Sequence, residues 1–530
     1  MSLLPRKLRL AVGRDTESAA PDWVIVDLHG HYPAYRSSDP LQSLMARGET
    51  LEGLTERLDR LAGLDWVSGV LVRIGELKVG LATAHALGLA LGRLAERTRV
   101  VAYLPQVSMR TLLVTAPLTE VVAPESAEVS VPGFAAEQVF YGAFLRKHGI
   151  GFENLRIREY KSALTAYSDD RMDEHEREQL SAYLDSVEGD WLADVAAGSD
   201  GAVLDAALVS AAELLDAGLI TRIAYDDEIV TPVERHWGRA LELLRPSLGR
   251  MRGGKTDGVA VVPVAGPIVS GRSRGTPPVP FLPGPVAGAD SVVEALRTAD
   301  RDEHVKAIVL YVDSPGGSAL ASDLICHAVA RCTTPVVAVM GELAASGGYY
   351  VLAQADHVVA DPYTLTGSIG VVVGKPVLAE FDDRHGLRAD TVGRATALFE
   401  SPHRPFSDAE RAWAERMMAD VYARFVERVA TGRGLSAERV DEIGRGRIWS
   451  GRDAERIGLV DELGDLTAGI AAARRLGGLA VDAPVRTVST GLVLPGVPAF
   501  GKDAAGSFAG LWPFGGEKVL TWMDRSVTIR

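Results

Sequence analysis

Short runs of β-branched and aliphatic residues alternate along this chain with longer segments that have the apolar spacing of helices. The runs at 306–312, 335–340 and 357–360 are almost continuously apolar. Continuous rather than alternating apolar residues are typical of parallel strands, because helices cover both faces of a parallel sheet. A helical segment at 319–332 separates the first two runs. The pattern therefore predicts α/β units, each with a mostly parallel sheet and covering helices.

One long amphipathic helix is expected later in each half of the chain, at 172–197 in the first half and at 406–431 in the second. Both segments open with acidic residues, which are favourable at a helix N-terminus. Asp173 and Ser407 have side chains that suit the N-cap position.

The chain also repeats itself at a nearly constant spacing, which predicts two homologous α/β halves. We expect an N-terminal segment at 1–20, a first repeat at 21–250, a second repeat at 257–480 and a Gly/Pro-rich tail at 481–530. The similar segments are 22–30 with 257–266, 68–74 with 306–312, 99–105 with 335–341, and 147–150 with 384–387.

Composition excludes several classes of protein. The 530 residues carry a formal net charge of −14, which argues against a nucleic-acid partner. No run approaches the roughly 20 apolar residues of a membrane span, and the N-terminus lacks the apolar core of a signal peptide. We therefore expect a cytoplasmic protein, with peripheral attachment to the inner face of the membrane left open. Cys326 and Cys332 fall on different faces of one helix, so neither a disulfide nor a metal site is expected.

Two glycine-rich motifs follow successive strands of the second half. The first is Asp313-Ser-Pro-Gly-Gly-Ser318, and the second is Ala344-Ala-Ser-Gly-Gly-Tyr-Tyr350. Ser346 would stand between a strand and a helix, beside the amide of Gly347. That amide and donors from the Gly316-Gly317 loop could hold the oxyanion of an acyl-transfer intermediate. The alternative is a tight strand–helix crossing that is filled by small residues.

The first half has neither motif, because Arg110 stands at the repeat position of Ser346. It instead supplies Lys161, where the second half has approximately Thr396. A serine hydroxyl needs a base, and a lysine can be one only when burial lowers its pKa enough to make it neutral. The alternative for Lys161 is a solvated side chain at a helix start.

Histidine is a poor candidate for the base. His357 follows Ser346 closely and reads as the start of a strand. His148 and His385 occupy matching repeat positions, which favours a structural role in both copies. The sequence does not exclude a Ser-His-Asp triad, but no feature of it supports one.

The motifs DSPGGS and AASGGYY, followed by Leu365-Thr-Gly-Ser-Ile-Gly370, resemble the signal peptide peptidase SppA (protease IV) family in its long, duplicated form. The segment YKSAL at 160–164 is similar to the one that carries the family's general-base lysine. The resemblance implies two tandem crotonase/Clp-like α/β repeats. It also implies a tetrameric assembly that degrades cleaved signal peptides, and an N-terminal membrane anchor that we do not find in this sequence.

The resemblance also assigns a role to each site residue. It implies Ser346 as nucleophile, Lys161 as base and Ser368 as the group that orients the lysine. Gly347 matches the oxyanion donor, and Gly316 and Gly317 match the loop that lines the site.

We therefore expect a serine peptidase that uses a Ser-Lys dyad on signal-peptide remnants or other unfolded peptides. It would need no cofactor or metal and would form a homotetramer. Two alternatives stay open. One is a crotonase-type acyl-CoA enzyme, and the other is a catalytically silent scaffold for membrane or stress-response partners.

Overall fold

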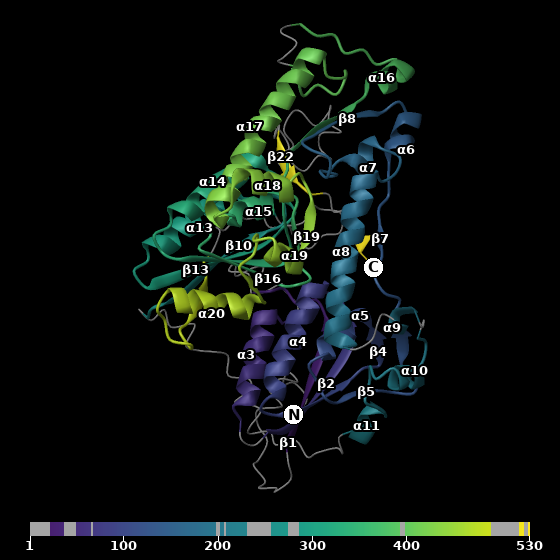
Figure 1. Ribbon diagram of the computed structural model, residues 1–530, viewed down its shortest axis with the longest axis vertical. Helices are drawn as coiled ribbons and strands as arrows, with labels where there is room; N and C mark the ends of the chain where they lie inside the picture. Colours follow the sequence, from purple (N-terminus) through teal and green to yellow (C-terminus); the bar gives the residue numbers. More distant parts are fainter. Residues whose placement is uncertain are drawn as a thin grey trace, which may run out of the picture. The chain divides into compact units, whose positions relative to one another are not determined.

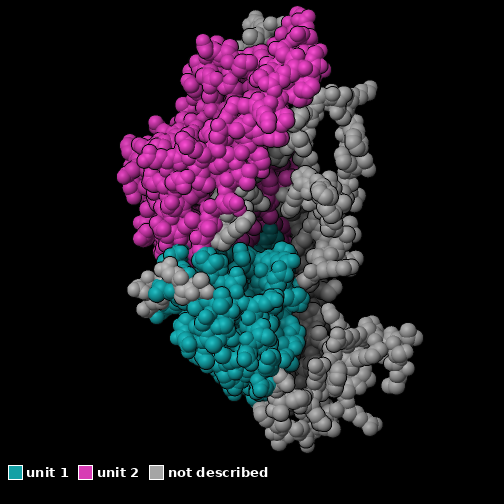
Figure 2. Space-filling view, turned by 90° about the vertical axis from the view of Figure 1, so that its right-hand side faces the viewer, with its two compact units in different colours: residues 1–133, 188–256 teal, residues 134–187, 257–530 magenta. Residues whose placement is uncertain are grey.

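The structure is a computed structural model that describes residues 22–35, 49–64, 67–197, 202–205, 208–229, 256–273, 286–392, 398–488, 519–523 and 528–529. It divides into two compact units, which are coloured separately in Figure 2. Unit 1 consists of residues 1–133 and 188–256, and unit 2 of residues 134–187 and 257–530. The expected N-terminal segment at 1–20 and most of the tail at 481–530 lie outside the described residues.

Unit 1 contains a five-stranded sheet in the order β1-β2-β3-β5-β9, and every neighbouring pair in it is parallel. Its strands are β1 (Asp22–Gly30), β2 (Val67–Leu77), β3 (Arg99–Tyr103), β5 (Val121–Ala123) and β9 (Arg222–Ile223). The other elements of this unit are α3 (Leu51–Ala62), α4 (Leu81–Ala95), β4 (Gln106–Ser108), α5 (Met109–Thr115), β6 (Glu128–Ser130), α9 (Ala202–Asp205), α10 (Ala211–Asp216) and α11 (Asp226–Ile229).

The main sheet of unit 2 has the order β19-β17-β15-β13-β10-β21, with β16 paired to β15 and β20 paired to β16. All of its pairs are parallel except β17 with β19. The strands are β10 (Gly258–Ala265), β13 (Val305–Ser314), β15 (Val336–Ala345), β16 (His357–Ala360), β17 (Leu365–Gly367), β19 (Ile448–Ser450), β20 (Glu462–Leu463) and β21 (Val485–Thr487).

A second sheet of unit 2 has the order β12-β11-β14-β22-β18-β8. Its pairs from β14 to β8 are antiparallel. The strands are β8 (Gly151–Arg156), β11 (Ile268–Val269), β12 (Ala287–Gly288), β14 (Gly316–Ser318), β18 (Val372–Val377) and β22 (Leu520–Trp522). A separate antiparallel pair joins β7 (Ala136–Glu137) to β23 (Thr528–Ile529).

The helices that begin in unit 2 are labelled in Figure 1 where there is room. The boundary between the units falls inside α8, after Val187. The helices are α6 (Gly142–Lys147), α7 (Thr165–Ser168), α8 (Glu174–Val195), α13 (Ala289–Arg301), α14 (Ala319–Arg331), α15 (Gly347–Leu352), α16 (Ala379–His385), α17 (Asp408–Arg433), α18 (Ala437–Ile443), α19 (Gly451–Arg456) and α20 (Leu466–Leu476).

The central strands are buried on both faces, as their continuous apolar pattern predicts. Four successive residues of β13, from Ala307 to Leu310, are fully buried. Successive side chains of a strand point to opposite faces, so both faces must be covered. Helix α13 packs on β10 and β13, and α20 packs on β13 and β15. The expected α/β class with mostly parallel sheets is confirmed.

The two long helices also form where they are expected, as α8 and α17. Asp173 Oδ1 accepts a hydrogen bond from the Glu176 N–H at 2.8 Å. Ser407 and Glu410 form a reciprocal capping box at the start of α17. Within the described residues, no helix is both long enough and apolar enough to cross a membrane.

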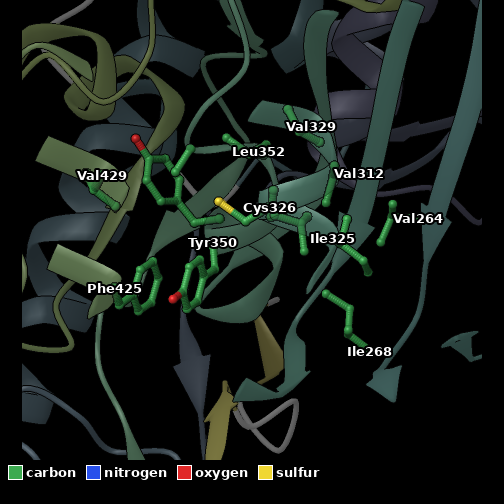
Figure 3. Packing of buried hydrophobic residues seen from close by; sticks show 14 of the residues in the cluster. Val264, Ile268, Val312, Ile325, Cys326, Val329, Tyr350, Leu352, Phe425 and Val429 are labelled. Atoms are coloured by element: carbon green, nitrogen blue, oxygen red, sulfur yellow. The ribbon is translucent and has the colours of Figure 1, made fainter. Parts of the chain in front are cut away.

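Helix α15 is held by the hydrophobic core of unit 2. The rings of Tyr350 and Phe425 stack with centroids 4.2 Å apart, and Figure 3 shows this pair with Cys326 close by. The Tyr349 hydroxyl donates to the carbonyl of Leu459 at 2.8 Å, and the Tyr350 hydroxyl donates to Asp323 at 3.0 Å. Stacked aromatic rings and buried hydroxyl hydrogen bonds restrict how far a short helix can shift. The residue in front of α15 therefore has a rigid support.

Candidate active site

Ser346 stands between strand β15 and helix α15, where the small-residue motif predicts it. Its backbone has φ 56° and ψ −114°, a region that costs a residue other than glycine about 1–3 kcal/mol. The Ser346 N–H donates to the Gly367 carbonyl at 2.8 Å, and the Ser346 carbonyl accepts from the Tyr350 N–H at 2.8 Å. The strained turn is thus fixed on both sides, which sets the direction of the serine side chain.

The two glycine-rich motifs touch each other. A side-chain carbon at Gly347 would lie 2.6 Å from Ser322 Oγ and 2.9 Å from the Cα of Gly316. Such distances leave no room for any side chain, so Gly347 is required by the close approach of the backbones. The alternative interpretation, a tight crossing filled by small residues, is therefore also correct as a description of the packing. The crossing brings Gly316 beside the residue that follows Ser346.

Lys161 reaches this place from the loop between β8 and α7. Strand β8 pairs antiparallel with β18 over six residues, from Arg156 with Val372 to Gly151 with Val377. The Ile157 N–H then donates to the Val371 carbonyl at 3.0 Å and continues the pairing. A strand from the first predicted repeat is thereby joined to a sheet formed mostly by the second. This pairing positions the lysine.

The Lys161 amine has three hydrogen-bond partners. Nζ lies 2.7 Å from Ser346 Oγ, 3.0 Å from Ser368 Oγ and 3.2 Å from the Ser368 carbonyl oxygen. Lys161 is 1% exposed and Ser346 is 0% exposed. The alternative of a solvated lysine is therefore wrong.

Burial lowers the pKa of Lys161 well below its ordinary value, because the charged form loses its hydration. A neutral amine has two N–H donors and one lone pair. The two donors match the two oxygens of Ser368, which leaves the lone pair for the hydroxyl hydrogen of Ser346. In its neutral form, the amine of Lys161 is thus arranged to accept the hydroxyl hydrogen of Ser346 in a hydrogen bond.

Strand register explains why Ser368 is part of this group. Strands β15 and β17 are parallel neighbours, and Ala345 pairs with Gly367. The residue that follows each strand is a serine, so Ser346 and Ser368 come directly after neighbouring strand ends. Ser368 also has a positive φ of 50°, and its N–H donates to the Arg447 carbonyl at 2.6 Å.

The backbone of Gly446 packs against the lysine. A side-chain carbon at Gly446 would lie 2.6 Å from both Cα and Cβ of Lys161. Gly446 also has a φ of +85°, a conformation that glycine adopts without strain. Sequence reasoning missed this residue, because the motif patterns do not show which distant glycine meets the lysine.

The three predicted oxyanion residues differ in their present hydrogen bonding. Gly347 is the first residue of α15, and an N–H group in a helix's first turn has no acceptor within the helix. The Gly316 N–H donates to Ser314 Oγ at 3.1 Å. Gly317 belongs to β14 and pairs with Thr521 of β22. The N–H of Gly347 therefore has no acceptor within α15.

Histidine residues have partners outside the site. His357 Nε2 lies 2.8 Å from Glu462 Oε2, and His385 Nδ1 lies 2.7 Å from the Phe381 carbonyl oxygen. Over the described ranges, no group of His, Cys, Asp or Glu is arranged to hold a metal ion. Thr396, which was expected at the repeat position of Lys161, lies outside the described residues.

The C-terminal strand β22 beside Gly316 and Gly317 is a further feature that sequence reasoning missed. The Gly/Pro-rich composition of the tail from 481 onward predicts no role, although residues 519–523 have an apolar, strand-forming composition.

Comparison with known proteins finds one peptidase family in both predicted repeats. The family model for Peptidase family S49 matches residues 93–236 and 329–480. The first match contains Lys161, and the second contains Ser346 and Ser368. The two matches begin at corresponding places of the predicted repeat. A Clp protease family model matches residues 282–362, which include both glycine-rich motifs.

Curated relatives are similar over long stretches. The chloroplastic serine protease SPPA of Arabidopsis thaliana is 29% identical over 474 residues, which cover 85% of this chain and 69% of that protein. Protease 4 of Salmonella typhi is 30% identical over 66% of this chain and 59% of that protein. Protease 4 of Haemophilus influenzae is 36% identical over 41% of this chain and 34% of that protein. The matches to the two bacterial proteins thus span less than two thirds of their length.

These similarities and the fold lead to one assignment. The family matches cover more than half of the chain, and they include the strand–helix turn with its serine and the loop with its buried lysine. The chain belongs to peptidase family S49 and is a serine peptidase.

Proposed function

We propose that this protein hydrolyses peptide bonds with Ser346 as nucleophile and Lys161 as general base. The observation that carries the proposal is the 2.7 Å hydrogen bond between Lys161 Nζ and Ser346 Oγ in a fully buried place. A neutral amine at this distance can take the hydroxyl proton as the oxygen attacks.

The reaction would follow the two steps of acyl transfer. Ser346 Oγ attacks the peptide carbonyl carbon while its proton moves to Lys161 Nζ. The carbonyl oxygen becomes an oxyanion, and the Gly347 N–H stabilises it. The C–N bond then breaks, and the lysine ammonium gives its proton to the leaving amine. A water molecule attacks the acyl-enzyme, its proton passes to the lysine and then to Ser346 Oγ, and the acid product leaves.

The proposed substrates are signal-peptide remnants and other unfolded peptides, by similarity to the SppA family. Small residues surround the nucleophile, among them Ala344, Ala345 and Gly347. They suit small or apolar substrate residues. A homotetramer at or near the cytoplasmic face of the membrane is proposed on the same resemblance. Light scattering on the purified protein and fractionation of cells test these two points.

A serine-reactive fluorophosphonate probe separates this proposal from its two rivals. We expect the probe to attach to Ser346, as read by peptide mapping, and to stop cleavage of a fluorogenic peptide. A silent scaffold would show no labelling at Ser346. An acyl-CoA enzyme would turn over thioesters and leave peptides intact, and that result would reject the peptidase assignment of the site.

The second serine of the site is proposed to act through the lysine. We expect Ser368→Ala to lower kcat by about 100-fold with little change in KM, because a misplacement of the base by about 1 Å can cost that much in rate. Steady-state kinetics on the same peptide measure this split. Ser436→Ala, which removes a serine that caps α18, is the matched control and should keep its kcat. Equal kcat values for Ser368→Ala and wild type would reject the orienting role.

A further inference from the structure

A segment near the C-terminus completes the second sheet of unit 2 directly beside the dyad. Strand β22 lies between β14 and β18 and is antiparallel to both. Beyond the strand, the Ala319 N–H donates to the Val519 carbonyl at 3.2 Å, and the Met523 N–H donates to the Pro315 carbonyl at 2.9 Å. In Figure 1 it is the short yellow element labelled β22 among green and teal ones. We call residues 519–523 the C-terminal strap.

The strap covers the loops that would receive a substrate. Thr521 Oγ1 would lie 2.7 Å from a side-chain carbon at Gly347, and the Thr521 carbonyl oxygen would collide with one at Gly316. Thr521 itself is fully buried, as is Ser346. A peptide carbonyl must come within bonding distance of Ser346 Oγ, next to the Gly347 amide. The strap lies where part of such a peptide would have to pass.

The strap also fills two side-chain pockets in the way an extended peptide does. Leu520 is buried in an apolar cluster with Ala163, Leu164, Val269 and Val372. The next residue, Thr521, has its hydroxyl 3.5 Å from Ser322 Oγ and 3.4 Å from the Gly317 carbonyl oxygen. Successive side chains of a strand point to opposite sides, so the slot offers an apolar pocket and a narrow polar pocket in alternation.

We propose that the C-terminal strap occupies the slot in which an extended peptide substrate binds, between the edges of β14 and β18, and competes with that substrate. The proposal rests on the proposed function of Ser346. Strands β14 and β18 are separated by the width of one strand, so a peptide between them can form main-chain hydrogen bonds with both. Pockets for alternate side chains then select its sequence. Without the strap, both edges would be unpaired. The substrate class that fits is an extended peptide with an apolar residue followed by a small one.

Removal of the strap is the first test. We expect a chain that ends at residue 518 to cleave a short fluorogenic peptide with a kcat/KM at least about tenfold above wild type. In wild type the substrate can bind only the fraction of molecules whose slot is free of the strap, and this fraction lowers the apparent affinity. A synthetic peptide with the sequence of residues 518–524 should inhibit the truncated chain competitively. A scrambled peptide of the same composition is its control and should not inhibit.

A substitution in the full-length chain provides the second test. Leu520→Asp places a carboxylate in an apolar cluster, which should release the strap and raise kcat/KM in the same way. Val481→Asp is the matched control, since Val481 is 88% exposed in the same unit, and its kcat/KM should equal that of wild type.

The wild-type protein offers a third test that does not depend on a variant's folding. Reaction with a peptidyl fluorophosphonate should place a peptide in the slot. The amides of Leu520 to Met523 should then lose their protection from hydrogen–deuterium exchange.

Unchanged protection in the labelled protein contradicts the proposal, as does a folded truncated chain with wild-type kcat/KM. If no form of the protein is labelled at Ser346, the proposed function itself fails. Labelling at equal rates with and without the strap rejects the strap's role alone.

Discussion

Replacement of Ser346 by alanine is expected to leave a folded protein whose peptidase activity is at least about 1,000-fold lower, since the oxygen that forms the acyl-enzyme is gone. The backbone of the turn is held by Gly367 and Tyr350 rather than by the serine hydroxyl. Alanine therefore fits the turn, and circular dichroism should be unchanged. Single-turnover cleavage of a fluorogenic peptide measures the loss.

The control for this variant is Ser407→Ala. That serine caps α17, so its loss should cost about 1 kcal/mol of stability and leave kcat unchanged. Near-normal cleavage by Ser346→Ala would reject the assignment of the nucleophile and, with it, the whole account of the site.

Lys161→Ala and Lys161→Arg are expected to lose activity to the same extent as each other, although the two variants differ in charge. Lys161→Ala has no base, and Lys161→Arg has a guanidinium that cannot release its proton in a protein. Both should be at least about 100-fold slower than wild type. Lys306→Ala, in which an exposed lysine is removed, should keep its activity. Normal cleavage by Lys161→Arg would show that the base is another group.

The pH dependence of the wild-type enzyme follows from the same lysine. Burial lowers the pKa of Lys161, and the proposed reaction needs the neutral form of this side chain. Activity should therefore be low at pH values below that depressed pKa, rise through it, and stay high at more alkaline pH. A profile of kcat/KM against pH tests this direction, and activity that falls over the same range would contradict it.

Stability should change in a way that separates loss of the base from misfolding. The unfolded chain binds a proton on Lys161 at pH values below its ordinary pKa of about 10.4, whereas the folded chain has released it above the depressed pKa. Between these two values folding must expel a proton, so the stability of wild type rises with pH. Lys161→Met removes this cost and should be more stable than wild type near pH 7. The part of the difference that comes from this proton should vanish as pH approaches about 10.4, as read by denaturant unfolding.

Much of the fold follows from the sequence because local pattern carries the relevant information. The apolar run at 306–312 lies within β13, the run at 335–340 begins one residue before β15, and the run at 357–360 is β16. Ser407 caps α17, as the polar residue before an amphipathic run predicts. Apolar periodicity depends on which side of an element faces the core, and that is a local property.

The candidate site was predictable to the extent that its residues stand in motifs. The sequence indicates Ser346 and Lys161 because each repeat has lost what the other retains. Their meeting depends on the pairing of β8 with β18, which joins residues about 220 positions apart. No local pattern specifies such a partner. The position of Gly446 behind the lysine and that of the strap beside Gly316 depend on long-range packing in the same way.

The pairing of β8 with β18 has an evolutionary consequence. A descendant gene that kept only the codons from 257 onward would encode the alcohol without the amine, and β18 would lose its neighbour. A second polypeptide would have to supply both the lysine amine and the strand that pairs with β18. If the proposed mechanism holds, a chain shortened in this way is inactive by itself.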